Sequence, residues 1–315
     1  MKISVLIPCY NEEESLLELY GKLEAVMAEN GYDYEYLFVD DGSTDRTVVV
    51  LRELRERSER VGVISFRRNY GKSAALNVGF RGVSGDVVIT MDADLQDDPA
   101  EIPNLLRAIE RGADLVSGWK VSRHDPINKT LPSKLFNAVT SLASGIKLHD
   151  FNCGLKAYRR EVVDSLTLYG ELHRFVPVLA NWEGFRVEEL GVTHHERKYG
   201  QSKYGPKRFL NGFFDLVTVM FVTRRALNPL HFFGRIAALL FTLGIIPQIY
   251  FLILWITGQG IHVRPVMLVG LVLVIVGLQI GSIGLLAEMI SSRSARDSTY
   301  AYREYSVGAK ERETV

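Results

Sequence analysis

The chain has 315 residues, 37 basic and 37 acidic side chains, and only two cysteines. Its length exceeds one average domain and allows one large domain with an appendage, while its zero net charge gives no argument for nucleic acid or an acidic polymer as a partner. Cys9 and Cys153 form no Cys-x-x-Cys pair, so both are expected to be reduced thiols of a cytosolic domain.

Short apolar runs alternate with helical patterns up to residue 117. No secretory signal is expected, because Met1 leads almost directly into the first run. The predicted strands cover residues 3–7, 34–39, 61–66, 87–91 and 114–117. The predicted helices follow Asn11, run through Leu51 and Leu54, and cover residues 71–81 and 101–111. This alternation predicts parallel βαβ units with helices on both faces of the sheet.

The first helix has its own start signal. Asn11 is expected to cap it, with Glu14 three residues later as the capping-box partner. The apolar positions at helical spacing are Leu16, Leu19, Leu23 and Val26.

Polar and acidic residues follow four of the predicted strands, at residues 8–12, 40–45, 67–72 and 92–98. Ligands of parallel sheets bind at the carboxyl ends of the strands, where the strand order reverses. The sequence therefore predicts that these four segments converge on one crevice.

The last of these segments holds a D-x-D pattern, Asp92 and Asp94, directly after an apolar run. In an extended chain the two carboxylates point to the same side, and two anions that close need a cation or a shared proton. A hard divalent cation, Mg²⁺ or Mn²⁺, fits because it takes oxygen ligands and bridges carboxylates to phosphates. An acidic turn that caps the helix near Glu101 is the structural alternative.

The pattern changes after residue 118. A polar loop spans residues 120–125, an amphipathic helix is predicted at 133–144, and a loop at 149–158 enters a strand. Another helix begins at Glu171 and ends near Gly184, and a strand at 187–194 leads into the basic, aromatic loop 197–204.

The C-terminal third is expected to meet a membrane. Residues 209–222 are apolar, bounded by basic residues and too short to span, so they predict an interfacial helix. Residues 236–256 and 266–287 lack any charge and are long enough to span a bilayer; a buried helical hairpin of a soluble protein is the alternative.

Arginines predict how these spans are oriented. One lies in the linker between the spans, whereas the outer flanks carry Arg224, Arg225, Arg235, Arg293, Arg296 and Arg303. The positive-inside tendency then puts both termini and the catalytic domain in the cytosol. Gly277 and Gly281 permit close helix approach, within the hairpin or between subunits.

Several functions are disfavoured. The first strand is not followed by G-x-G-x-x-G, which argues against a dehydrogenase, and Gly71-Lys72-Ser73 lacks the first glycine of a Walker A loop. His194 and His195 have no matching ligand cluster, so zinc is not expected.

Four segments together resemble the successive motifs of inverting GT-A (family-two) glycosyltransferases. They are Ile7-Pro8-Cys9-Tyr10-Asn11-Glu12, Asp40-Asp41-Gly42-Ser43-Thr44-Asp45, Asn69-Tyr70-Gly71-Lys72 and Asp92-Ala93-Asp94-Leu95-Gln96-Asp97. Residues 171–175, the loop 197–204 and the two spans resemble the polyprenyl-phosphate glycosyltransferases, the group of the dolichyl-phosphate mannose synthases. Lys120 departs from the arginine expected in that branch, which leaves the donor sugar open.

The resemblance implies a Rossmann-like, mostly parallel α/β sheet flanked by helices, followed by an interfacial helix and a two-helix transmembrane hairpin. The corresponding segments are a catalytic domain at 1–204, an amphipathic helix at 205–230, the hairpin at 231–291 and a cytosolic tail at 292–315.

The resemblance also assigns residue roles. The nucleotide-sugar would contact Pro8, Tyr10, Glu12, Asp41, Lys72, Asp92, Ala93 and Lys120. For Lys72 the alternative is a solvated lysine on the first turn of a helix. Asp94 and Gln96 would hold Mg²⁺ or Mn²⁺, and Asp92, Asp94 and Asp150 would be the catalytic residues, with Asp150 positioning sugar or phosphate. The acceptor phosphate would contact Arg174, Arg197, Ser202 and Lys203.

The predicted reaction is transfer of one sugar from a nucleotide-diphosphate sugar to a polyprenyl phosphate on the cytosolic leaflet, with inversion. A processive polysaccharide synthase is the first alternative, although its Q-x-x-R-W motif is missing. A non-catalytic, membrane-anchored nucleotide-sugar sensor is the second. The sequence leaves open whether the chain forms a homo-oligomer.

Overall fold

The structure is a computed structural model that describes residues 1–121, 137–138, 140–141, 144–196, 198–199, 229–258 and 264–294. The chain divides into two compact units, one built around an α/β sheet and one around two long helices. The predicted amphipathic helix at 205–230 and the tail at 292–315 lie almost entirely outside the described residues, as does the domain boundary at 204, so these stay predictions.

The first unit carries strands and helices in the alternating order that the sequence predicts. In chain order they are β1 (Lys2–Cys9), α1 (Leu16–Glu29), β2 (Asp33–Asp40), α2 (Thr47–Arg57), β3 (Val61–Ser65), α3 (Lys72–Gly82), β4 (Val87–Thr90), the 3₁₀ turn η1 (Pro99–Glu101), α4 (Ile102–Glu110), β5 (Leu115–Lys120), β6 (Lys156–Arg159), α6 (Arg160–Ser165), the 3₁₀ turn η2 (Leu172–Arg174), α7 (Val176–Trp182) and β7 (Val187–Val192). The short helix α6 was not predicted, and the predicted helix at 133–144 lies largely outside the described residues.

The strands form one sheet in the order β3-β2-β1-β4-β6-β5-β7. The sheet is mostly parallel, as predicted, but β6 runs antiparallel to both of its neighbours, β4 and β5. The chain moves outward from β1 to β2 and β3 and then returns to β4 on the other side of β1. The strand order therefore reverses between β1 and β4. Ligands are expected to bind next to the carboxyl ends of these two strands.

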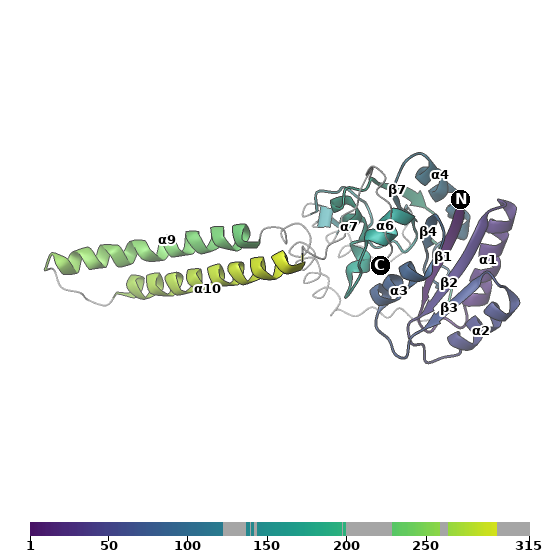
Figure 1. Ribbon diagram of the computed structural model, residues 1–315, viewed down its shortest axis with the longest axis horizontal. Coiled ribbons are helices and arrows are strands. Elements are labelled where there is room, and N and C mark those ends of the chain that lie inside the picture. The colour runs from purple at the N-terminus through teal and green to yellow at the C-terminus, as the bar shows by residue number, and fades with distance from the viewer. Residues whose placement is uncertain are drawn as a thin grey trace, which may run out of the picture. The chain divides into compact units, whose positions relative to one another are not determined.

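Alternating side chains of β1 build the core on both faces of the sheet. Ile3, Val5 and Ile7 are fully buried in a cluster with the apolar face of α1, while Leu6 lies on the opposite face, where it contacts Gly79 of α3. Helices cover both faces of the sheet (Figure 1). This two-sided burial explains why the central strands read as continuous apolar runs.

The predicted cap of α1 is wrong. The helix begins at Leu16 after Ser15, which makes no side-chain cap hydrogen bond. Asn11 instead has a positive φ of 53°, and its side-chain oxygen accepts a hydrogen bond from the Thr44 N–H at 2.8 Å. The amide of Asn11 is used to join the loops after β1 and β2, and asparagine tolerates this left-handed conformation better than most residues.

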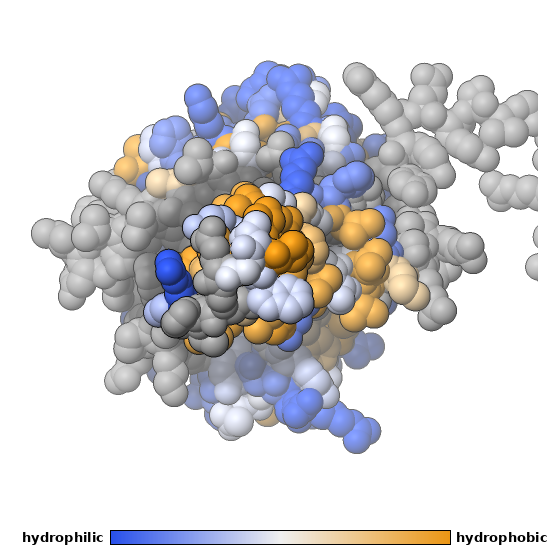
Figure 2. All heavy atoms as spheres, turned by 90° about the vertical axis from the view of Figure 1, so that its left-hand side faces the viewer, coloured by the Kyte–Doolittle hydropathy of each residue, from blue (hydrophilic) through white to orange (hydrophobic). Residues whose placement is uncertain are grey.

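The second unit contains α9 (Pro229–Ile256) and α10 (Pro265–Ser294). Both are long and apolar enough to cross a membrane over Leu230–Ile256 and Pro265–Met289. Large hydrophobic side chains are exposed along both helices, and hydrophobic residues are visible on the helix pair in Figure 2. This outward-facing hydrophobicity disfavours the alternative of a hairpin buried in a soluble protein.

Glycines lie where the two helices pack together. A Cβ atom built on Gly277 of α10 would lie 3.0 Å from both the carbonyl oxygen of Ala237 and the nitrogen of Phe241 in α9. One built on Gly281 would lie 3.5 Å from the Cβ of Ala237. The G-x-x-x-G pair therefore serves helix packing within the hairpin.

Candidate active site

Acidic residues from three strand ends lie close together at the carboxyl edge of the sheet, where the sequence predicts the crevice. Burial raises the pKa of the Cys9 thiol at the end of β1 well above its usual value, and nearby carboxylates raise it further. These carboxylates belong to Glu12, Asp40 and Asp92. The structure thus brings together the loops after β1, β2 and β4, as the sequence predicted.

The loop after β2 is fixed by its own carboxylates. Asp41 accepts backbone hydrogen bonds from Tyr70 at 2.7 Å and Gly71 at 2.9 Å. Burial raises the pKa of Asp41, and these two bonds only partly offset the effect. Gly42 has a φ of 70°, and a Cβ there would lie 2.3 Å from the backbone of Arg68. The loops after β2 and β3 are therefore held together, and they form one wall of the crevice that the sequence predicts.

Three further residues predicted to contact the nucleotide lie at or next to β1. Pro8 belongs to β1 and pairs with Val39 of β2, while Tyr10 and Glu12 follow the strand and are partly buried. The backbone N–H of Glu12 donates to the Thr47 hydroxyl at 2.8 Å. All three residues thus lie next to the loop after β2, which carries Asp41.

The D-x-D pattern lies in a turn rather than at the end of an extended strand. β4 ends at Thr90, so the argument that alternation directs Asp92 and Asp94 to one side does not apply. Between them Ala93 is buried, and Leu95 just after them has a φ of 61°. The turn, not strand alternation, sets the directions of the two carboxylates.

Lys72 at the start of α3 forms an ion pair and hydrogen bond with Asp92. Burial opposes ionisation of Asp92, but this partner outweighs it, and the pKa of Asp92 falls to about 2. Lys120 and Lys156 contribute in the same direction. A Cβ on Gly154 would lie 2.7 Å from the Asp92 carboxylate. Asp92 is therefore held in its ionised form. Its carboxylate packs against the backbone of Gly154, which leaves no space for a side chain at that position.

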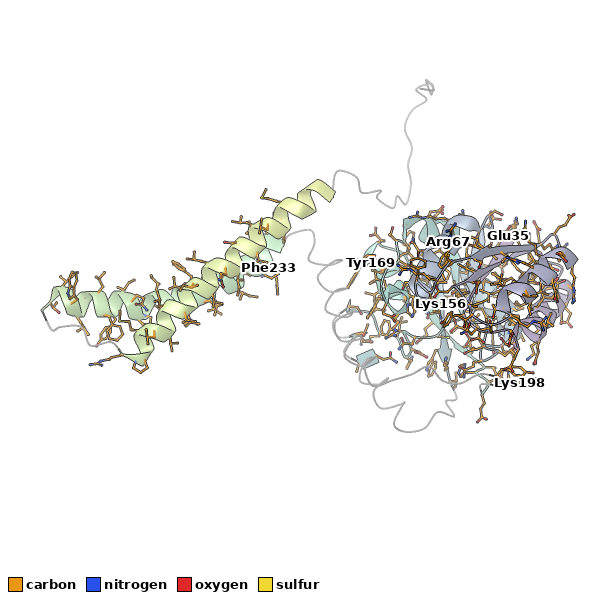
Figure 3. The ribbon with its side chains drawn as sticks, turned by 90° about the horizontal axis from the view of Figure 1, so that it is seen from below. Glu35, Arg67, Lys156, Tyr169, Lys198 and Phe233 are labelled. Carbon is orange, nitrogen blue, oxygen red and sulfur yellow. The ribbon has the colours of Figure 1, made fainter. Side chains whose placement is uncertain are left out.

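Sequence reasoning assigned no role to Lys156, which begins β6. It pairs with Thr90 of β4, is only 4% exposed, and its ammonium donates to the carbonyl oxygen of Cys153. Figure 3 shows it inside the sheet unit. Burial and the charge of Lys72 lower its pKa, and the carboxylates of Asp150 and Asp92 oppose this. The available signal was a basic residue directly before the buried residues Ala157 and Tyr158 of β6.

Lys120 and Asp150 lie near the same cluster. Burial disfavours the charge of Lys120, yet neighbouring carboxylates, Asp97 foremost and Asp150 and Asp92 after it, raise its pKa. Asp150 is 1% exposed and accepts a hydrogen bond from the Asn152 N–H at 3.0 Å. Its own N–H donates to Glu189 at 2.9 Å. The structure therefore places Lys120 close to Asp150 and Asp92, and Glu189 supports the loop that carries Asp150.

Oxygen ligands suitable for a metal are present after β4. Asp94 is 8% exposed, and one of its oxygens accepts the Gln96 N–H at 3.2 Å. Carboxylate and amide oxygens in a tight turn beside a second carboxylate are the donor set of Mg²⁺ or Mn²⁺, which keeps further positions for phosphate oxygens and water. The residues present fit such an ion.

The described residues hold no cluster of three or more His, Cys, Asp and Glu side chains that could bind a metal. His194 and His195 instead face Asp97 and Asp98 at 3.4 Å and 2.9 Å.

Only one of the predicted acceptor residues is described. Arg174, in η2, is 8% exposed and donates to Glu171 at 2.7 Å. Its neighbour His173 contacts the Ser73 hydroxyl at 2.9 Å, so η2 packs against the first turn of α3 beside Lys72. Arg197, Ser202 and Lys203 lie outside the described residues.

The mostly parallel sheet with a D-x-D turn at its switch point is the GT-A fold of a glycosyltransferase, and two helices apolar enough to cross a membrane follow it in the chain. The chain belongs to glycosyl transferase family 2, whose model matches residues 4–167.

Curated relatives extend this similarity beyond the family model. The chain is 37% identical to dodecaprenyl-phosphate galacturonate synthase of Rhizobium johnstonii, over 94% of this chain and 90% of that protein. It is 38% identical to undecaprenyl-phosphate 4-deoxy-4-formamido-L-arabinose transferase of Klebsiella pneumoniae, over 92% of this chain and 88% of that protein.

Solved structures support the fold. Glucosyl-3-phosphoglycerate synthase from Mycobacterium tuberculosis in complex with uridine-diphosphate has a TM-score of 0.51 and 21% identity, over 70% of this chain and 79% of that one. The same enzyme with Mn²⁺ and uridine-diphosphate-glucose has a TM-score of 0.52 and 21% identity, over 70% and 78%.

Proposed function

We propose that this enzyme transfers a single sugar from a nucleotide-diphosphate sugar to a polyprenyl phosphate, with inversion, on the cytosolic leaflet of a membrane. The proposal rests chiefly on the 37% sequence identity to dodecaprenyl-phosphate galacturonate synthase over 94% of the chain, a span long enough to include both apolar helices. A likeness confined to the sheet would have left the acceptor open.

The donor is held by the wall at β1 and β2 and by the lysine cluster. Asp41, fixed by two backbone hydrogen bonds, faces the nucleoside together with Tyr10 and Glu12. Lys72 lies at the start of α3, where a helix N-terminus favours negative charge. Lys72 pairs with Asp92, and both contact the donor when its diphosphate enters.

Asp94 and Gln96 hold Mg²⁺ or Mn²⁺ in this proposal. When bound, the ion supplies Lewis-acid stabilisation of the charge that develops on the diphosphate. The solved enzyme with this fold in complex with Mn²⁺ and a nucleotide-sugar is consistent with this use. Lys72 and Lys120 add fixed positive charge around the same leaving group.

The acceptor needs positioning rather than deprotonation. A phosphate monoester has a second pKa near 6, so its attacking oxygen is already largely ionised at neutral pH. That oxygen forms the new bond to the anomeric carbon as the bond to the diphosphate breaks from the opposite face, which inverts the configuration. Arg174, Arg197, Ser202 and Lys203 bind the acceptor phosphate, and Asp150 positions sugar or phosphate.

The membrane supplies the acceptor. α9 and α10 cross the bilayer with their linker outside, because the arginines flank the outer ends of the pair. The sheet unit and both termini then lie on the cytosolic side, where nucleotide-sugars are available. A polyprenyl chain stays in the bilayer while its phosphate reaches the crevice.

The direct test incubates membranes containing the enzyme with labelled nucleotide-sugars, undecaprenyl phosphate and Mg²⁺ or Mn²⁺. We expect label in the lipid extract with one donor and none when EDTA is present. Label in a polymer would support a processive synthase, and nucleotide-sugar binding without turnover would support a sensor. No lipid-extractable label from any donor in a broad panel would refute the proposal.

A further inference from the structure

Two segments far apart in the chain are joined beside the D-x-D turn. Asp97 forms an isolated antiparallel bridge with His194, and the His195 N–H donates to the carbonyl oxygen of Gln96 at 2.8 Å. One of these segments carries the proposed metal ligands, and the other is the exit of β7 that leads to Arg197 and Lys203. We call this contact the Asp97–His194 link.

The centre of the link is buried. The side chains of His194 and Asp97 are 9% and 2% exposed, and their Nδ1 and Oδ1 atoms lie 3.4 Å apart. Neither atom has a hydrogen-bond partner in the described structure, so the two groups face each other without hydrogen-bond alignment. A buried carboxylate is costly unless charges or hydrogen bonds compensate it, and besides His194 the carboxylate of Asp97 interacts with the charge of Lys120.

Flanking contacts prevent this pair from moving independently. His195 contacts Asp98 at 2.9 Å. The hydroxyl and N–H of Thr193 both donate to Glu101, at 2.8 and 3.0 Å. The metal turn and the end of β7 are thus fastened at consecutive positions on both sides of the link.

We infer that His194 and Asp97 are positioning residues that hold Gln96 and Asp94 in their metal-binding arrangement and tie that arrangement to the segment entering the acceptor loop. The inference rests on the proposed function, since it assumes that Gln96 and Asp94 hold the ion. Residues behind metal ligands set ligand orientation, and their loss weakens metal binding by about 10- to 100-fold.

The structure offers a matched control on the same segment. Lys198 follows the link by four residues and donates to Glu18 of α1 at 2.6 Å, and its exposed side chain lies at the edge of the sheet unit (Figure 3). Glu18→Gln therefore loosens this segment without touching the metal turn.

The test measures Mn²⁺ binding by electron paramagnetic resonance on the full-length protein in detergent, with Mn²⁺ alone and with each of the common nucleoside diphosphates. We expect His194→Ala and Asp97→Asn each to weaken Mn²⁺ binding about 10-fold or more. The double variant should be little worse than either, because both remove one contact. Glu18→Gln should leave Mn²⁺ binding unchanged.

A second measurement separates positioning from general damage. In the transfer assay, the link variants should raise the KM for polyprenyl phosphate as well as lower kcat, while thermal unfolding stays close to that of the wild type. Asp97→Asn is isosteric, so if the His194→Ala variant does not fold, the Asp97→Asn variant is used for the test.

Mn²⁺ affinity within twofold of the wild type in a folded link variant would overturn the inference, as would an equal loss in Glu18→Gln. A wild-type protein that binds no Mn²⁺ with any nucleoside diphosphate would overturn the metal part of the proposed function as well. Normal wild-type binding with unaffected variants would overturn only the inference.

Discussion

Replacing Gly154 with alanine should disturb the site without removing any charge. A Cβ at this position would lie 2.7 Å from Cγ and Oδ2 of Asp92, whereas ordinary contact begins at 3.4 Å. The carboxylate must therefore move by about 0.7 Å. Because Asp92 is paired with Lys72, its displacement also shifts the ammonium that we place on the donor diphosphate.

Misplacement of a positioning group by about 1 Å can cost roughly 100-fold in rate. We expect Gly154→Ala to lower kcat by about 10- to 100-fold, equivalent to about 1.4 to 2.8 kcal/mol of lost transition-state stabilisation. The initial rate of label transfer to polyprenyl phosphate measures this loss with the donor that the screen identifies.

The matched control is Gly21→Ala, which places a Cβ on the exposed side of α1 with no atom within 4 Å. It should leave kcat unchanged and stabilise the helix by about 0.5 to 1 kcal/mol. A folded Gly154→Ala enzyme with kcat within twofold of the wild type would show that the position of Asp92 does not matter for transfer.

Three further predictions address separate parts of the chain. Asp94→Ala should abolish turnover while circular dichroism remains that of the wild type, and retained activity would refute its role as a metal ligand. Burial opposes ionisation of Glu35, but hydrogen bonds from Lys2 and two serines outweigh it and lower the pKa of Glu35 to about 2 in the folded protein. Because this folded pKa lies below the unfolded pKa of 4.5, ionised Glu35 stabilises the protein fully above pH 4.5. The stabilisation is lost as the pH falls toward 2. Glu35→Gln should therefore lower the free energy of unfolding by about 1 to 3 kcal/mol at pH 7 and much less near pH 2, and an equal loss in urea titrations at both pH values would contradict this. Cysteines at Ala237 and Gly281, whose Cβ atoms would lie 3.5 Å apart, should form a disulfide within one chain upon oxidation in a background free of Cys9 and Cys153, and a cross-linked dimer on gels would instead place the G-x-x-x-G contact between subunits.

The fold could be predicted because most of its strands and helices leave a pattern in the residues that form them. The central strands are buried on both faces, so they appear as apolar runs, and the helices between them show apolar periodicity. The start of α1 was missed because Asn11 uses its amide for a contact with Thr44, 33 residues away, rather than for capping. A capping rule that considers only neighbouring residues does not include a partner so far away in the sequence.

The same distinction explains the site. Asp41, Asp92 and Asp94 follow strands in the sequence, so their convergence followed from the topology of parallel sheets. Lys156 reaches the site because β6 runs antiparallel beside β4, and His194 meets Asp97 across 97 positions of the chain. Neither pairing has a local signature.

The charge arrangement suits the movement of charge in the proposed reaction. Before transfer, Lys72 neutralises Asp92, and Lys120 and Lys156 interact with the same carboxylate. As the new bond forms, one negative charge leaves the acceptor phosphate and appears on the departing diphosphate. In our proposal the donor diphosphate lies beside Asp92, so the lysines near that carboxylate stabilise the negative charge that arrives on the diphosphate. A nucleotide-sugar sensor would also use lysines to bind a diphosphate, so turnover in the transfer assay, and not the lysine cluster, separates a transferase from a sensor.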